Sequence, residues 1–145
     1  MGNGITGWGY EGRTVADLVA FARAKGAEWV VDVRLNPISR KPGFSKKALG
    51  AALAAEGLQY LHLPALGNPK DNRAGFADVA GADGRVARRR YRAEVIESPG
   101  ARAALHRLAE LDVQGGAVLL CFEADARTCH RADVERALRA TSLAA

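Results

Sequence analysis

The sequence contains little cysteine and no long apolar run. It has 2 cysteines among its 145 residues, which is too few for a disulfide framework. No apolar run approaches the length of a membrane span, and the first ten residues lack the charged and apolar regions of a signal peptide. These absences predict a cytoplasmic protein without membrane contact, whose cysteines are thiols or ligands rather than structural cross-links.

Lysine is also scarce, whereas arginine is abundant. The chain has 16 arginines and 5 lysines, and its net charge is +5. The planar arginine fork suits phosphate and carboxylate groups. A GC-rich genome would account for the arginine total but not for the clustering of arginines along the chain. The 48% of hydrophobic and 26% of charged residues otherwise fit one soluble domain spanning residues 1–145.

Buried strands alternate with amphipathic helices along the chain. This alternation predicts an α/β fold, a single three-layer domain with a mostly parallel four-stranded sheet and helices on both faces. Residues 70–84 are polar and rich in Gly, Ala and Asp, which indicates a loop or flexible insertion. The predicted strands are 5–8, 29–33, 58–63 and 117–120, and the predicted helices run from Thr14 to Gly26, from Ser45 to Glu56, over 85–97, from Ser98, and from Thr128 to about Ala140.

Reactive side chains cluster after the last strand, in residues 121–131. Thr128 is a suitable helix N-cap, which would place Cys129, His130 and Arg131 in the first helical turn. A helix N-terminus attracts anions and lowers the pKa of a thiol, so Cys129 is the better candidate nucleophile. The alternative is structural: Cys121 is a core residue, and Glu123 forms a plain ion pair with Arg131.

Polar groups also follow the second and third strands. Asp32 and Arg34 end the second strand, and the loop over residues 34–47 carries five basic residues and no acidic one. His62 ends the third strand. Because ligands bind beyond the carboxyl ends of parallel strands, these groups favour an anion site at that rim. A solvated basic loop and a packed histidine are the structural alternatives. The glycines of GWGYEG are only a weak phosphate-loop signal.

The predicted helix over residues 85–97 is strongly basic. Arg88, Arg89, Arg90 and Arg92 cover much of it, with Tyr91 on its apolar face. Arginine together with an aromatic residue is typical of nucleic-acid binding, and a solvated surface is the equal alternative.

Four blocks of the sequence resemble the domain-of-unknown-function family 488, over nearly the whole chain. They are GWGYEGRTVADLVAF, VVDVRLNPISRKPGFSKKAL, YLHLPALGNP and LLCFEADARTCHR. The resemblance implies a compact bacterial or archaeal α/β domain without an established reaction. Thr6-Gly7-Trp8 stands where Ile-Gly is more usual, which should affect packing more than chemistry. The positions that match the family's motifs are Asp32, Arg34, Ser39, Arg40, Lys41, Pro42, Gly43, Phe44, His62, Leu66, Gly67, Cys121, Glu123, Cys129, His130 and Arg131.

The first hypothesis is a pocket for a phosphorylated small molecule, a nucleotide or nucleic acid, with no cofactor. Whether it catalyses a reaction is open, and no oligomeric state is predicted. The candidate binding residues are Asp32, Arg34, Ser39, Arg40, Lys41 and Arg131, and the candidate catalytic residues are His62, Glu123, Cys129 and His130.

Three other hypotheses stay open. The first is a nucleic-acid-binding module without catalysis, based on the basic helix and loop. The second is a zinc or iron site drawn from Cys121, Glu123, Cys129, His130 and His62, although their spacing is not a recognised metal motif. The third is a redox role for the two thiols, which the absence of a CxxC motif disfavours.

Overall fold

The sheet is fully parallel, as the alternation of strands and helices predicts. In the computed structural model, which describes residues 4–144 and side chains as far as residue 140, the strand order is β1-β4-β2-β3. The strands are β1 (Ile5–Gly9), β2 (Trp29–Asp32), β3 (Gln59–His62) and β4 (Ala117–Cys121). The predicted α/β class with a parallel four-stranded sheet is therefore confirmed.

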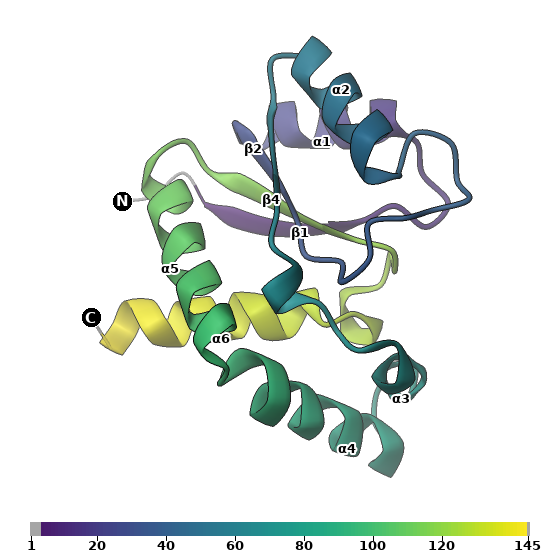
Figure 1. The fold of residues 1–145 in the computed structure, drawn as a ribbon, viewed down its shortest axis with the longest axis vertical. Helices are drawn as coiled ribbons and strands as arrows, with labels where there is room; N and C mark the ends of the chain where they lie inside the picture. Colours follow the sequence, from purple (N-terminus) through teal and green to yellow (C-terminus); the bar gives the residue numbers. More distant parts are fainter. Residues whose placement is uncertain (1–3, 145) are drawn as a thin grey trace.

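Helices cover both faces of the sheet (Figure 1). On one face, α1 (Val15–Ala24) and α2 (Lys46–Ala55) pack with Val118 and Leu120 of β4. On the other, α5 (Pro99–Val113) and α6 (Arg131–Ala144) pack with Leu119. Successive β4 side chains point to opposite faces, and both faces are buried. This explains the unbroken apolar run of the strand.

Residues 70–84 are helical in part, which differs from the loop or insertion expected. They contain a 3₁₀ turn (Lys70–Asn72), α3 (Arg73–Phe76) and the start of α4 (Ala82–Tyr91). Asn72 is buried, and its amide donates to Asn68 and to the Ala87 carbonyl. Phe76 packs edge-on against Tyr91, with the ring centroids 6.1 Å apart. The Phe76–Tyr91 ring contact and the hydrogen bonds of Asn72 hold this segment in place. Its helices are too short to show helical periodicity in the sequence.

The basic helix starts earlier than predicted and changes pitch. After α4, the chain continues as a π-helical turn (Arg92–Ile96), and Ser98 then caps α5 by accepting from the Ala101 N–H at 3.1 Å. The capping role predicted for Ser98 is confirmed.

The last helix begins at Arg131, so the prediction that Thr128 caps it is wrong. Thr128 ends a 3₁₀ turn (Ala126–Thr128), and its hydroxyl donates to the Asp125 carbonyl at 2.9 Å. Asp125 caps this turn, and Cys129 is extended. Cys129 is therefore outside the helix, and the helix-terminus argument for its reactivity fails.

Candidate functional site

The register of the sheet gathers the carboxyl ends of the strands at one rim. Gly9 is paired with Cys121, and Asp32 is paired with both Leu120 and His62. Cys129 is bonded to Cys121, so it lies at the same rim. Residues far apart in the chain meet there, as parallel topology requires.

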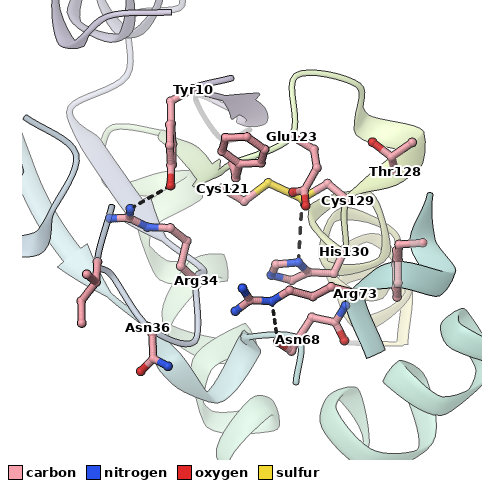
Figure 2. Close-up of a pocket in the computed structure, with 13 residues that line it drawn as sticks. Tyr10, Arg34, Asn36, Asn68, Arg73, Cys121, Glu123, Thr128, Cys129 and His130 are labelled. Carbon is pink, nitrogen blue, oxygen red and sulfur yellow. Dashed lines mark hydrogen bonds between the residues drawn. A yellow bond between two sulfur atoms is a disulfide. The ribbon is translucent and has the colours of Figure 1, made fainter. Parts of the chain in front are cut away.

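A cavity of about 370 Å³ opens at this rim. In Figure 2, Tyr10 and Arg34 lie on one side, and Glu123, Cys129 and Thr128 lie on the other. The lining residues are Tyr10, Arg34, Asn36, Ile38, Asn68, Arg73, Phe76, Cys121, Phe122, Glu123, Thr128, Cys129 and His130.

Arg34 is fixed in the pocket wall by the fully buried Asp32. Its Nε and Nη2 donate to the two carboxylate oxygens of Asp32 at 2.8 and 2.7 Å. The Tyr60 hydroxyl donates to the same carboxylate at 2.6 Å. Burial alone would lower the pKa of Arg34, but the hydrogen bonds and charge of Asp32 raise it above its ordinary value. Arg34 is therefore permanently charged and held in place, although its charge is largely compensated.

Arg73 is the second arginine of the pocket, and the sequence did not single it out. Figure 2 shows its side chain between His130 and Asn68. Its Nε donates to the Asn68 carbonyl at 3.4 Å, and among the described residues it forms no ion pair with a carboxylate. Arg73 lies in residues 70–84, which the sequence analysis predicts to be a loop. A single arginine in a loop shows no helical periodicity that would mark it as a site residue.

His130 is buried and uncharged at neutral pH. Its Nε2 lies 2.8 Å from the carbonyl oxygen of Val33. A carbonyl only accepts, so Nε2 carries the proton, and Nδ1 has a free lone pair. Nδ1 lies 3.8 Å from the Cys129 sulfur. Burial lowers the pKa of His130 to about 4.

Cys121 and Cys129 are joined in a disulfide that forms part of the pocket lining. The prediction that they are thiols or ligands is wrong for this structure. Glu123 lies beside the disulfide, and one oxygen of its carboxylate and the two sulfurs lie within 4.8 Å of one another. This grouping would serve the metal hypothesis only in the reduced protein. Burial raises the pKa of Glu123.

Arg131 lies behind the pocket and holds the loop that follows β4. Its guanidinium donates to the Glu123 carbonyl, to the Ala124 carbonyl at 2.8 Å and to the Cys121 sulfur at 2.9 Å. It forms no ion pair with the Glu123 carboxylate, contrary to the structural alternative.

Gly9 allows the loop after β4 to approach β1 closely. A Cβ at Gly9 would overlap the Glu123 carbonyl, so the space beside this glycine is occupied by neighbouring backbone and not by a phosphate.

The model of the family described as "Domain of unknown function DUF488" matches residues 14–138. The chain belongs to the DUF488 family. Comparisons with curated proteins and with solved structures gave no match. Among the described residues of this DUF488 protein, no helix is long and apolar enough to cross a membrane.

The structure separates the predicted site residues of this DUF488 chain into two groups. Four of them line the pocket: Arg34, Glu123, Cys129 and His130. The others, which lie outside the lining, are Asp32, Ser39, Arg40, Lys41, His62 and Arg131.

Two of the residues outside the lining, His62 and Ser39, form hydrogen bonds that support the backbone near the pocket. His62 Nε2 lies 2.7 Å from the Arg34 carbonyl oxygen, so it helps to position the Arg34 backbone. Ser39 accepts from the Lys41 N–H at 3.1 Å and shapes the basic loop. That loop reaches the pocket through Arg34, Asn36 and Ile38, and its other four basic residues lie outside the lining.

Proposed function

We propose that the rim pocket binds a phosphorylated ligand, with a nucleotide as the best fit. The observation that carries the proposal is the presence of two guanidinium groups, those of Arg34 and Arg73, in one cavity. Its volume of about 370 Å³ falls within the usual range of small-ligand pockets, about 300–1,000 Å³.

Arg73 is the residue we assign to the phosphate. Its Nη atoms make no hydrogen bond with a described residue, whereas Arg34 donates from two nitrogens to Asp32 and from Nη1 to the Tyr10 hydroxyl at 3.4 Å. Two parallel N–H groups of an arginine match two phosphate oxygens. Arg73 therefore supplies the charge, and Arg34 supplies a fixed second donor.

Phe122 offers a surface for the base. Its side chain is 47% exposed although it is large and apolar. It packs edge-on against Tyr10, with the centroids 5.3 Å apart. Stacking on such a ring contributes about 1–3 kcal/mol per base in single-stranded nucleic-acid complexes. This aromatic ring favours a nucleotide over inorganic phosphate.

Processing of the bound ligand would depend on Glu123 and His130. The carboxyl group of Glu123 has a raised pKa, and the Nδ1 of His130 has a free lone pair. A carboxyl acid and an imidazole base in one cavity are suited to proton transfer. Cys129 is a nucleophile only after reduction of the disulfide.

The test is a titration with adenosine monophosphate carrying a ribose fluorophore, followed by fluorescence polarisation at low salt. We expect Arg73→Ala to weaken binding by about tenfold or more, because a hydrogen bond to a charged group contributes about 1.5–3 kcal/mol. Arg40→Ala is the matched control: it removes an arginine outside the pocket lining and should change Kd by less than about twofold. Equal weakening by the two variants would reject the pocket.

The basic helix is the alternative nucleic-acid surface. Two of its arginines are already engaged: Arg88 donates to the carbonyls of Phe76, Asp78 and Arg127, and Arg90 pairs with Asp71 and Glu94. Arg89 and Arg92 are exposed. If this surface binds nucleic acid, Arg89→Ala rather than Arg73→Ala will reduce the shift of an oligonucleotide in a gel across a range of salt concentrations.

A further inference from the structure

We infer that Cys121 and Cys129 form a redox-active site that exchanges with a low-molecular-weight thiol entering through the pocket. The inference does not depend on the phosphorylated ligand. It rests on the position of the disulfide and on the different group that contacts each sulfur.

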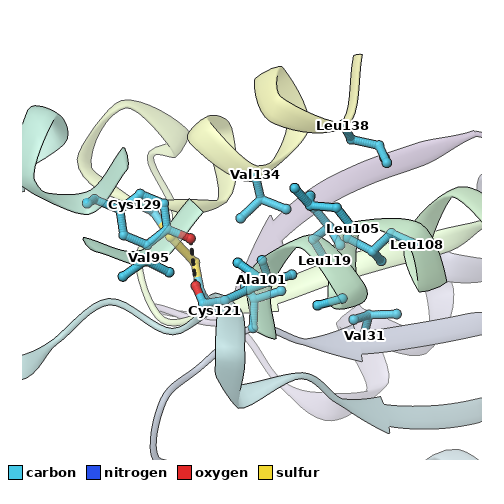
Figure 3. Packing of buried hydrophobic residues seen from close by; sticks show 14 of the residues in the cluster. Val31, Val95, Ala101, Leu105, Leu108, Leu119, Cys121, Cys129, Val134 and Leu138 are labelled. Atoms are coloured by element: carbon cyan, nitrogen blue, oxygen red, sulfur yellow. Dashed lines mark hydrogen bonds between the residues drawn. A yellow bond between two sulfur atoms is a disulfide. The ribbon is translucent and has the colours of Figure 1, made fainter. Parts of the chain in front are cut away.

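Both cysteines of the disulfide line the rim pocket, and Cys129 also borders a second cavity of about 220 Å³ beside Asp133 and Arg136. Figure 3 shows the disulfide at one end of the apolar cluster that includes Val134, Ala101 and Leu119. The exposed fractions of the two cysteines are 1% and 3%, so the thiol of a folded partner protein cannot reach them. A small thiol can enter the rim pocket, which sets the class of reductant.

The Cys121 sulfur lies against a buried guanidinium that forms no direct ion pair with a described carboxylate, although Glu123 and Glu135 act on it through space. Arg131 is 2% exposed, and among the described residues it has no ion pair. Its partners are two carbonyls and this sulfur, at 2.9 Å from Nη1, while its Nε has no acceptor at all. A buried charge without a bonded counter-ion is costly. A thiolate on Cys121 would neutralise it and accept a charge-assisted hydrogen bond.

The Cys129 sulfur faces a proton acceptor instead. The His130 Nδ1 lies 3.8 Å away, and the Val33 carbonyl holds the opposite ring nitrogen. The Arg131 backbone N–H also donates to this sulfur at 3.4 Å. After reduction, a Cys129 thiol can therefore donate a hydrogen bond to the Nδ1 of His130 and keep its proton. The two sulfurs are thus suited to different states, Cys121 to the thiolate and Cys129 to the thiol.

These contacts define the direction of exchange. The entering thiolate attacks the Cys129 sulfur, the S–S bond breaks, and its electron pair leaves on Cys121 beside Arg131. A second small thiol then attacks the mixed disulfide and releases Cys129. Overall, the protein disulfide and two small thiols give one protein thiolate, one protein thiol, one small-molecule disulfide and one released proton. The small thiol is oxidised and the protein is reduced.

The first experiment uses the wild-type chain. The folded protein is equilibrated in mixtures of reduced and oxidised glutathione, trapped by alkylation and weighed by mass spectrometry. We expect complete and reversible reduction with an unchanged circular dichroism spectrum. Ultraviolet absorbance of the reduced protein at pH 7 should show one thiolate, which Cys121→Ser removes and Cys129→Ser retains. A pair that glutathione reduces only after unfolding, or a reduced form without thiolate, would overturn the proposal.

The second experiment tests the role of Arg131. Arg131→Met should shift the glutathione equilibrium at least about tenfold toward the disulfide, because it removes the charged hydrogen bond to the Cys121 sulfur. Arg131→Lys keeps the charge and should restore much of the shift. Arg139→Met, an exposed arginine of the same helix, is the matched control and should behave as wild type. An equilibrium unchanged by Arg131→Met, in a variant that folds, would overturn the assignment of Cys121 as leaving group.

A metal is the competing occupant of the reduced pair. One equivalent of zinc per reduced chain, bound so that both thiols resist alkylation, would assign the sulfurs and Glu123 to a metal site and overturn the redox proposal. We expect no zinc retention after dialysis, and alkylation of both thiols.

Discussion

Two buried arginines at the rim show how a side chain's partners decide its role. Arg34 is bound to the carboxylate of Asp32 on two sides. Within the described part of the chain, the guanidinium of Arg131 donates hydrogen bonds to two carbonyls and a sulfur. The first charge is compensated by a bonded carboxylate at the pocket wall, and the second has no directly bonded carboxylate among the described residues. The sequence placed both residues in one list of anion ligands because residue type alone does not show which acid lies opposite.

The Asp32–Arg34 pair gives a stability prediction. Asp32→Asn would leave the guanidinium of Arg34 buried without a counter-ion, which typically costs about 3–5 kcal/mol. We expect a loss of about 3 kcal/mol in the free energy of unfolding, measured by urea denaturation. Asp71→Asn is the control, because its side chain is 75% exposed, and it should change stability by less than about 1 kcal/mol. Equal losses in both variants would show that Asp32 does not neutralise a buried charge.

His130 gives a prediction about pH. Its pKa falls from 6.5 to about 4 in the folded chain because the ring is buried. The unfolded state therefore binds more protons between these two pH values, and the folded state loses stability as the pH falls from 6.5 to 4. The loss through this residue is about 3 kcal/mol, since each tenfold change in proton affinity corresponds to about 1.4 kcal/mol.

The comparison with His130→Gln isolates this effect. Burial raises the pKa values of Glu123 and Asp133, so these groups act in the opposite sense as the pH falls. We subtract the unfolding free energy of the variant from that of the wild type. This difference should be constant above pH 7 and should decrease as the pH falls from 6.5 to 4. A difference independent of pH would mean that the pKa of His130 is the same in the folded and unfolded states, contrary to the burial argument.

At the scale of elements, the site depends on how the loop after β4 packs against β1. The Tyr10 N–H donates to the Cys121 carbonyl at 3.1 Å, and the Glu11 N–H donates to the Phe122 carbonyl at 2.8 Å. These bonds extend the β1–β4 ladder beyond the strands. They place Phe122 and Glu123 at the pocket, where a short polar loop alone would not hold them.

The start of α6 shows what sequence patterns leave undecided at this scale. Both Asp125 and Thr128 are good capping residues. The sequence analysis assigned the cap to Thr128, whereas in the structure Asp125 caps a short 3₁₀ turn by accepting from the Arg127 N–H at 2.9 Å, and the last helix begins only at Arg131. Residue type identifies capping residues but does not show whether they begin a short turn or a long helix. The strands were easier to predict because an unbroken apolar run has few alternatives.

Paired glycine substitutions test the packing of the loop against β1. Gly9→Ala should destabilise the fold by about 1–3 kcal/mol, as overpacking does, because the new methyl group overlaps the Glu123 carbonyl. Gly50→Ala lies within α2, with the new Cβ 3.8 Å from Tyr60, and should stabilise by about 0.5–1 kcal/mol. Thermal melts of both variants give the signs. Gly9→Ala melting at or above the wild-type temperature would contradict the close approach.

At the scale of the whole molecule, the sequence predicted the layers of the fold and the rim of the sheet. It did not predict that Arg73 and a disulfide lie at that rim. Parallel topology alone brings Asp32, His62 and the first cysteine to one edge. Arg73 arrives there through a short helix held by buried Phe76, and no local pattern reveals such a tertiary contact. The disulfide was missed because the eight-residue separation of its cysteines does not fix the distance between the end of β4 and the segment before α6.

The most direct test of the rim pocket is a crystal structure of the chain with adenosine monophosphate. We predict density for the phosphate within hydrogen-bond distance of Arg73, with Arg34 as a second donor and the base against Phe122. A nucleotide bound at the basic loop or along α4, with the rim cavity filled only by water, would contradict this account.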